Sequence, residues 1–473
     1  MTRRALPIAC LLAVVALVTG CAGASSTPAA IPDSASLAPA DALAYVTVTT
    51  DEGSDQWKKA ESLLERIPGA GEGISGSIGS ALGEQGLDWT KDVAPALGSE
   101  LVVVATAAKQ PIVLVRPEDE QKLDALVAQS DTPLVRGTVE DWQVLAQDQA
   151  ALDAYRAALD KGTLEGVDTF SQGFGALPSD AIARAWVDTA RLAKDLGQLV
   201  PQGSGSPELD LGLDWLSAAV SARDDGALLT VAMRTPGGGD TRYEPELFQR
   251  VPADAVAALS FGGTQGLLDR LQGKAPLDEV SGEIERLTGV SLQGIVDALS
   301  GEGALYVRQS GTTVPEVTLA LRPPDPSKTW DTVEGLARKL AEQGGATVTV
   351  RTENGIEVRR VTLDDVTVSY ARPSDDTIIL TTGADGIRTF LASGPKLVDA
   401  DAYTRAAEAV SMGERTRGFL YVDVDGLLPL AEAAGGEIPP EVDDALGAVD
   451  SFILEGTGEG DTTQLAGFLR LND

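Results

Sequence analysis

An internal repeat is the sequence feature that most constrains how this chain can fold. Pro39-Ala40-Asp41-Ala42-Leu43-Ala44 recurs 213 positions later as Pro252-Ala253-Asp254-Ala255-Val256-Ala257. Further segments recur in the same order, namely 101–107 with 304–309, 111–117 with 317–323, 183–188 with 418–423, and 217–234 with 451–470. The chain is therefore predicted to contain two homologous repeats, residues 37–235 and 249–473, joined by a linker at 236–248.

Each repeat is predicted to be an α+β domain, with a mainly antiparallel sheet and helices packed on one face. Short alternating strands and tight turns are interrupted by amphipathic helices, as at residues 57–67, whose apolar period suits the cover of a sheet. About 200 residues per repeat are enough to bury a core without disulfides or a structural metal.

The second repeat carries an insertion. The offset between copies rises from 206 at Arg116 and Arg322 to 235 at Asp188 and Asp423, a gain of 29 residues. The gain coincides with residues 346–361, where apolar residues alternate around Asn354-Gly355. Because Asn-Gly supplies the two positive φ angles of a type I′ turn, a β-hairpin is predicted there.

The N-terminus has the pattern of a lipoprotein signal peptide. Arg3 and Arg4 precede a 14-residue apolar run that is too short to span a bilayer, and Val18-Thr19-Gly20-Cys21 resembles a bacterial lipobox. Residues 1–20 are predicted to be removed and Cys21 to be lipidated. Residues 21–36, rich in small residues and Pro, are predicted to form a flexible tether. The predicted location is extracytoplasmic, with the chain lipid-anchored to the bacterial cell membrane.

The composition excludes several kinds of chemistry. The chain has no His, so it has no imidazole base, no Ser-His-Asp triad and no His-ligated metal. Of its two cysteines, Cys10 lies in the signal peptide and Cys21 is the lipid site, which leaves no free thiol. A net charge of −34 repels nucleic acid. We therefore predict no catalytic residue, no cofactor, no metal and no nucleic-acid partner.

Three motif matches lack the context that their chemistry requires. Gly71-Glu72-Gly73-Ile74-Ser75-Gly76 fits a dinucleotide loop but follows a predicted helix instead of a strand. Ser393-Gly394-Pro395-Lys396 fits the S-x-x-K pattern of penicillin-binding enzymes, but Gly-Pro prevents the helical turn that stacks Ser over Lys. Asp423-Val424-Asp425-Gly426 begins like a calcium loop without the remaining ligands; Asp425 is instead predicted to cap a helix, with Thr189 as its counterpart.

The aromatic and acidic residues give structural predictions. The six tryptophans are expected in the core, and two or three that met at an open groove would instead indicate a stacking site. Acidic pairs are expected in solvated turns, with weak divalent-cation binding as the alternative, at Asp224-Asp225, Asp364-Asp365, Asp375-Asp376 and Asp443-Asp444.

The residues at 37–46, followed by Trp57 in a helix ending at Ile67-Pro68, resemble the bacterial envelope family called domain of unknown function 3352. The resemblance continues to the segment around Asp423 and to the closing hairpin. The family has no assigned activity. The resemblance therefore implies the architecture and an envelope setting, and it supplies no catalytic residues.

These patterns predict a membrane-anchored extracytoplasmic lipoprotein that acts as a non-enzymatic binding or scaffolding module of the cell envelope. Its partner would be an envelope protein or an apolar ligand, and no ligand-binding residue is assigned. One alternative is a carrier or sensor of an apolar ligand such as lipid, which requires a large apolar pocket. Another is a carboxylate-based glycan hydrolase, which requires two carboxylates about 5 to 10 Å apart across a cleft.

Overall fold

The computed structural model divides the chain into two compact units. It describes residues 30–68, 87–106, 110–130, 133–199, 212–239, 241–263, 290–309, 315–363, 366–433, 443 and 445–472. Unit 1 comprises Met1–Gly239, Asp444–Val449 and Gly458–Asp473, and unit 2 comprises Asp240–Asp443 and Asp450–Thr457. The sequence-based limits of the signal peptide and linker stay predictions. The predicted tether at 21–36 extends too far, because residues 33–37 form a short 3-10 helix with Ser34, Ala35 and Leu37 buried.

Unit 1 is an antiparallel sheet with helices between its strands. Its elements are η2 (Asp33–Leu37), β1 (Ala44–Thr49), α2 (Asp55–Glu65), η3 (Trp89–Val93), α4 (Ala94–Leu97), β2 (Glu100–Ala105), β3 (Pro111–Val115), α5 (Glu120–Ala128), β4 (Val135–Val139), β5 (Trp142–Ala146), α6 (Gln149–Leu159), η4 (Leu164–Gly166), α7 (Asp168–Gly175), β6 (Ala183–Val187), α8 (Thr189–Leu199), β7 (Trp215–Ala222), β8 (Gly226–Arg234) and β18 (Thr462–Leu471).

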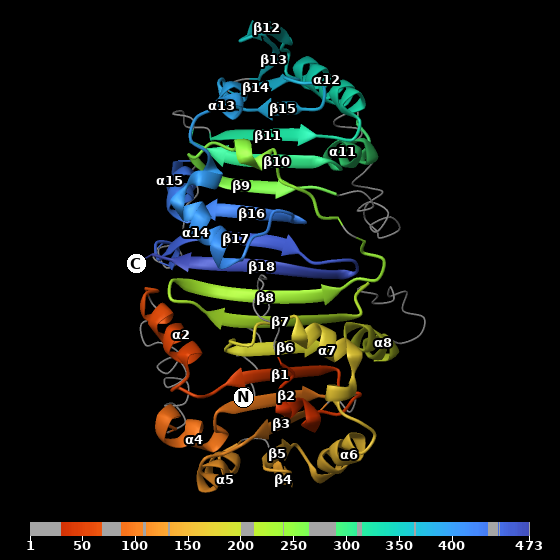
Figure 1. Ribbon diagram of the computed structural model, residues 1–473, viewed down its shortest axis with the longest axis vertical. Coiled ribbons are helices and arrows are strands. Elements are labelled where there is room, and N and C mark those ends of the chain that lie inside the picture. The colour runs from red at the N-terminus through yellow and green to blue at the C-terminus, as the bar shows by residue number, and fades with distance from the viewer. Residues whose placement is uncertain are drawn as a thin grey trace, which may run out of the picture. The chain divides into compact units, whose positions relative to one another are not determined.

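The first strand of unit 1 lies in the middle of its sheet. The strands follow the order β4-β5-β3-β2-β1-β6-β7-β8-β18, and every neighbouring pair is antiparallel (Figure 1). The chain must therefore return from β5 to β6 across one face of the sheet. Helices α6, η4 and α7 make that return, and they supply the helical layer that the sequence predicted.

Alternation along the strands separates the two faces of unit 1. Tyr45 of β1 belongs to the larger apolar cluster, where Phe170 and Phe174 of α7 pack against it with ring centroids 5.3 and 5.6 Å away. Leu101 and its β3 partner Val115 belong to a smaller cluster under α2, η3 and α5. Because neighbouring side chains on a strand point to opposite faces, this second cluster covers the other face near one end.

Unit 2 contains a similar series of elements. They are η5 (Phe248–Arg250), β9 (Ala255–Phe261), α11 (Leu292–Leu299), β10 (Glu302–Arg308), β11 (Glu316–Arg322), α12 (Pro326–Gln343), β12 (Thr349–Glu353), β13 (Ile356–Leu363), β14 (Val366–Ala371), β15 (Ile378–Thr381), α13 (Gly386–Leu391), η6 (Leu397–Asp399), α14 (Asp401–Ala409), β16 (Gly418–Asp423), α15 (Val424–Ala433) and β17 (Val449–Thr457).

The sheet of unit 2 repeats the plan of unit 1. Its antiparallel order is β12-β13-β14-β15-β11-β10-β9-β16-β17, with β9 between β10 and β16 (Figure 1). Tyr45 pairs with Trp186 in unit 1 and Ala258 pairs with Tyr421 in unit 2, at the offsets of the sequence repeat. The predicted α+β fold in two homologous halves is confirmed, and β12 and β13 have no counterpart in unit 1.

The inserted hairpin has the predicted turn. Asn354 and Gly355 have φ angles of 52° and 84°, and Glu353 of β12 pairs with Ile356 of β13. Both φ angles are positive, as a type I′ turn requires.

Register corrects one detail of the repeat. When the two repeats are aligned by sequence, Ser217 corresponds to Ser451. Trp186 pairs with Ser217, however, and the equivalent Tyr421 pairs with Ile453, so the equivalent of Ser217 is two residues further on. Because side chains alternate with a period of two, such a shift keeps every residue on its expected face and is invisible to the apolar pattern.

The predicted helix caps at Thr189 and Asp425 are wrong. Asp188 accepts the Arg191 N–H at 2.8 Å, and Asp423 accepts the Gly426 N–H at 3.0 Å. A cap stands immediately before the first helical residue, so Asp188, which follows β6, and Asp423, the last residue of β16, take this role. Asp188 and Asp423 are equivalent positions of the two units.

The close backbone contact at Gly98, just before β2, gives a testable prediction. Its φ is +76°, and a Cβ there would lie 1.9 Å from the Arg116 carbonyl oxygen. We expect Gly98→Ala to lower the free energy of unfolding by roughly 2 kcal/mol or more, from left-handed strain and the backbone clash. Gly166→Ala is the control, because its Cβ would meet nothing within 4 Å. Urea unfolding followed by tryptophan fluorescence measures both variants, and equal stability would contradict the contact.

Candidate functional site

Some of the sequence-predicted features lie outside the described residues: Cys21 with its lipobox, Gly71-Glu72-Gly73-Ile74-Ser75-Gly76, the acidic pair Asp364-Asp365, and Asp444 of the pair Asp443-Asp444. Within the described ranges, no group of three or more acidic residues is placed to hold a metal ion. No helix in that part of the chain is both long and apolar enough to cross a membrane. The candidate sites are therefore two surface hollows and a set of buried carboxyl groups.

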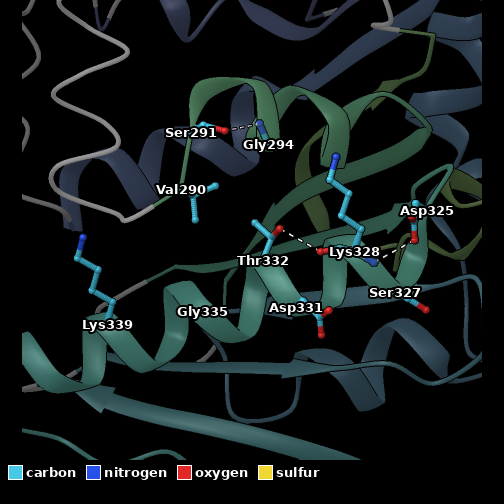
Figure 2. Close-up of a pocket in the computed structure, with 10 residues that line it drawn as sticks. All are labelled: Val290, Ser291, Gly294, Asp325, Ser327, Lys328, Asp331, Thr332, Gly335 and Lys339. Carbon is cyan, nitrogen blue, oxygen red and sulfur yellow. Dashed lines mark hydrogen bonds between the residues drawn. The ribbon is translucent and has the colours of Figure 1, made fainter.

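The larger hollow lies in unit 2 between α11 and α12 and measures about 690 Å³. Figure 2 shows Lys328 and Lys339 rising from α12 with Thr332 and Gly335 between them, and Ser291 facing them from the start of α11. The full lining is Val290, Ser291, Gly294, Asp325, Ser327, Lys328, Asp331, Thr332, Gly335 and Lys339. The lining holds two ammonium and two carboxylate groups, so its charges balance.

Most polar groups of this hollow already serve the helices. Ser291 accepts the Gly294 N–H at 3.1 Å, and Asp325 accepts the Lys328 N–H at 3.0 Å, so both are helix caps (Figure 2). The Lys328 ammonium donates to Asp297 at 2.7 Å. Hydrogen bonds from Lys328 and then Gln293 lower the pKa of Asp297. The hollow thus holds few polar groups that are free to select a ligand.

The smaller hollow, of about 270 Å³, lies in unit 1 and is acidic. Asp51, Glu52 and Glu118 all line it. Asp51 accepts the Gly53 N–H at 2.8 Å, and Glu52 accepts the Thr90 hydroxyl at 3.1 Å. Two of its three carboxylates are therefore held as local hydrogen-bond acceptors.

The S-x-x-K match is structural. The Lys396 ammonium donates to the carbonyl oxygens of Ala392 at 2.8 Å and Arg250 at 3.0 Å. It thereby ties the end of α13 to the end of η5. A lysine that donates to two carbonyls in this way is not poised as a base for Ser393.

The tryptophans lie mainly in the core, as predicted. Five are at most 8% exposed: Trp57, Trp89, Trp142, Trp186 and Trp215. Trp57 and Trp89 stack at 5.6 Å, but they do so inside the smaller apolar cluster of unit 1. Trp330 is half-buried beside Tyr370. None of the six lines either hollow.

A largely buried glutamate occupies the same place in both units. Glu100 begins β2 and accepts the Ser34 hydroxyl at 3.4 Å; Glu302 begins β10 and accepts the Leu247 N–H. Ser34 and Leu247 are themselves equivalent positions. Burial raises the pKa of both carboxyl groups, and Arg184 and Arg322 respectively oppose that rise. Each glutamate therefore holds the segment that leads into the central strand.

Glu455 of β17 is the most unusual carboxyl group. Its side chain is 0% exposed, and neither oxygen has a hydrogen-bond partner among the described residues. Burial raises its pKa to about 7, and the nearby Gly413 N–H offsets this only in part. It pairs across the sheet with Phe419, which packs against Phe248 at 4.5 Å. A buried acid in this apolar setting is neutral below pH 7 and is destabilising once ionised.

Comparisons with known proteins leave the family open. No family model and no curated protein matches the chain. Solved structures of TP0453 in crystal forms I, III and IV align with 47–49% of this chain and 93–94% of theirs. Sequence identity is 14% and the TM-scores are 0.25 to 0.26, too low to support an argument about fold or function.

Sequence reasoning missed the buried glutamates, although a signal for Glu455 was present. In β17, Val449, Ser451, Ile453 and Glu455 follow one another at every second position, so they share a face. The face of Val449 and Ile453 is apolar, which places Glu455 in the core. A pair of adjacent acidic residues is more conspicuous in the sequence than a single glutamate within an apolar strand.

Glu455 predicts a pH dependence of stability. Its folded pKa of about 7 is above its ordinary value of 4.5. Its protonated form therefore favours the fold below pH 4.5, and this contribution is lost as the pH rises towards 7. We expect Glu455→Gln to remove up to roughly 3 kcal/mol of the stability difference between pH 5 and pH 8.

Calorimetric unfolding of the wild type and the variant at both pH values measures this difference. Glu408→Gln, which changes an exposed glutamate of α14, is the matched control and should leave the pH dependence unchanged. An identical pH dependence in the wild type and Glu455→Gln would show that Glu455 is not buried in its neutral form.

Proposed function

We propose that this chain is a lipoprotein of the cell envelope, anchored outside the cytoplasm through Cys21, and that it binds or organises a partner without catalysing a reaction. The N-terminal sequence supports the lipid anchor, because Arg3-Arg4 is followed by an apolar run and then by Val18-Thr19-Gly20-Cys21. The same series implies that residues 1–20 are removed.

The start of the described chain supports a short attachment. Ser34, Ala35 and Leu37 of η2 are at most 2% exposed, so unit 1 is packed from this point onward. Asp33 stands twelve positions after Cys21, and an extended chain spanning twelve positions reaches about 40 Å. The tether would therefore keep unit 1 close to the membrane surface.

The packing of the described residues favours binding at a surface over carriage of an apolar ligand. A carrier needs a large apolar cavity, whereas both hollows are open and lined mainly by polar and charged residues. The core of unit 1 is filled by aromatic side chains such as Tyr45, Phe170 and Trp186.

The carboxyl groups favour a non-enzymatic role over glycan hydrolysis. A glycosidase acid needs a raised pKa at the edge of a cleft. Among the described carboxyl groups, burial raises the pKa of Glu100, Glu302, Asp423 and Glu455. None of these four lines either hollow.

Substitution of the lipid site tests the anchor. We expect Cys21→Ser to move the protein from the membrane fraction to the soluble or secreted fraction, because the acyl chains supply the membrane affinity. Cys10→Ser is the matched control and should remain in the membrane fraction, since Cys10 lies in the removed peptide. Immunoblots of fractionated cells report both results, and a Cys21→Ser protein that stays with the membrane would refute the anchor.

A further inference from the structure

The inserted strand β12 adds nothing to the core of unit 2. Four of its five residues are exposed and the fifth, Glu353, is half-buried. Core burial is the main source of stability in a fold, so β12 contributes little to that of its own unit. The strand has no counterpart in unit 1, where the equivalent sheet ends at β4. The role of β12 therefore lies in what it exposes.

β12 exposes an open sheet edge. Among the described strands it pairs only with β13, and Figure 1 shows it as the last strand of the unit 2 sheet. In a two-residue hairpin the pair that flanks the turn is hydrogen-bonded, here Glu353 with Ile356, and the pairs alternate from there. The backbone N–H and C=O groups of Val350 and Thr352 therefore point outward, where another strand can pair with them.

β12 exposes an apolar side chain at this edge. The large hydrophobic residues that are exposed in the described chain are Val317, Leu340, Val350 and Val366, all of them in unit 2. Val350, at 55%, is the most exposed of the four. It lies opposite Arg359, whose guanidinium sits 5.2 Å from the Trp330 ring of α12. Val350 thus extends the apolar face that α12 covers.

The charge of this region is opposite to that of the chain. The β12–β13 hairpin, residues 349–363, contains three Arg and two Glu, in a chain whose net charge is −34. Arg359 pairs with Glu357 and Arg360 pairs with Glu353, both at 2.7 Å, and Arg359 also pairs with Glu334 of α12. Arg351 of β12 is exposed and has no ion-pair partner in the part of the chain that the structure describes. The edge therefore presents an uncompensated positive charge.

β4, the end strand of the unit 1 sheet, differs from β12 in its charge and in its exposure. Arg136 of β4 is paired with Glu120 at 2.6 Å and with Asp124 at 2.5 Å. β4 is also more buried than β12, with only Thr138 exposed along its length. Its charge is neutralised and its apolar residues are covered, so β4 is a natural comparison for β12.

We propose that β12 is a docking edge for an extended acidic segment of another envelope protein, which adds a strand to the sheet of unit 2. This site rests on the binding role proposed above and names its location and partner. Backbone pairing supplies affinity, while Val350 and Arg351 select an apolar and an acidic side chain on the two faces. A second copy of β12 fits poorly, because pairing two basic edges brings like charges together.

The test is photo-crosslinking of the full-length lipoprotein in its own membranes, with benzoylphenylalanine in place of Val350. We expect an adduct with another protein, with the crosslink mapped by mass spectrometry to a segment rich in Asp and Glu. Thr352→Pro removes an outward N–H without touching the β12–β13 bonds, and it should lower the adduct yield by ~10-fold or more. Thr138→Pro, at the equivalent position of β4, should leave the yield unchanged.

Arg351→Glu provides a second test that does not alter the backbone, and it should also lower the yield by inverting the selecting charge. An adduct with a second copy of this chain, or one unchanged by Thr352→Pro and Arg351→Glu, would overturn the proposal. A second chain carries benzoylphenylalanine at Thr138 of β4. Adducts formed only from that position would overturn the β12 site but leave a binding role intact. A lack of adducts from both positions would count against both proposals.

Discussion

The first strand of each unit lies inside its sheet and not at an edge, and this placement determines where the helices lie. Because β1 pairs with β2 on one side and β6 on the other, the chain must return across the sheet after β5. The return carries Phe170 and Phe174 onto Tyr45. In unit 2 the same return carries Tyr403 towards Tyr421, with ring centroids 5.3 Å apart. The aromatic cores are thus a consequence of strand order.

The buried glutamates secure this arrangement at its entrance. Glu100 and Glu302 each bind the segment that precedes the first strand of the unit. Glu302 lies opposite Arg322 of β11, and the positive charges of Arg184 and Arg116 lie near Glu100. A buried carboxylate is costly unless it is hydrogen-bonded and opposed by positive charge. Both copies meet those conditions, whereas Glu455 does not. Glu455 therefore destabilises the fold once its carboxyl group is ionised.

The features that depend on local sequence patterns could be predicted from the sequence. The repeat, the fold class and the Asn354-Gly355 turn follow from spacing and turn chemistry, and the structure agrees. Sequence reasoning missed the Asp188 and Asp423 caps, because a cap is defined by a helix start that periodicity locates only to within a residue or two. It also missed Glu100 and Glu455, since strand pairing decides which buried positions face a partner. The open edge at β12 could be recognised only from the strand order in the structure.

We propose a duplicated α+β fold, anchored through a short tether, in which one copy has gained the β12–β13 hairpin and the outer strand of that hairpin serves binding instead of packing. Native mass spectrometry of the protein, extracted gently from its own membranes, tests this most directly. The account predicts a lipidated chain that carries a protein-sized partner, released at high salt because the edge is basic and the partner acidic. A chain that instead carries a stoichiometric small apolar molecule would contradict it and identify a carrier.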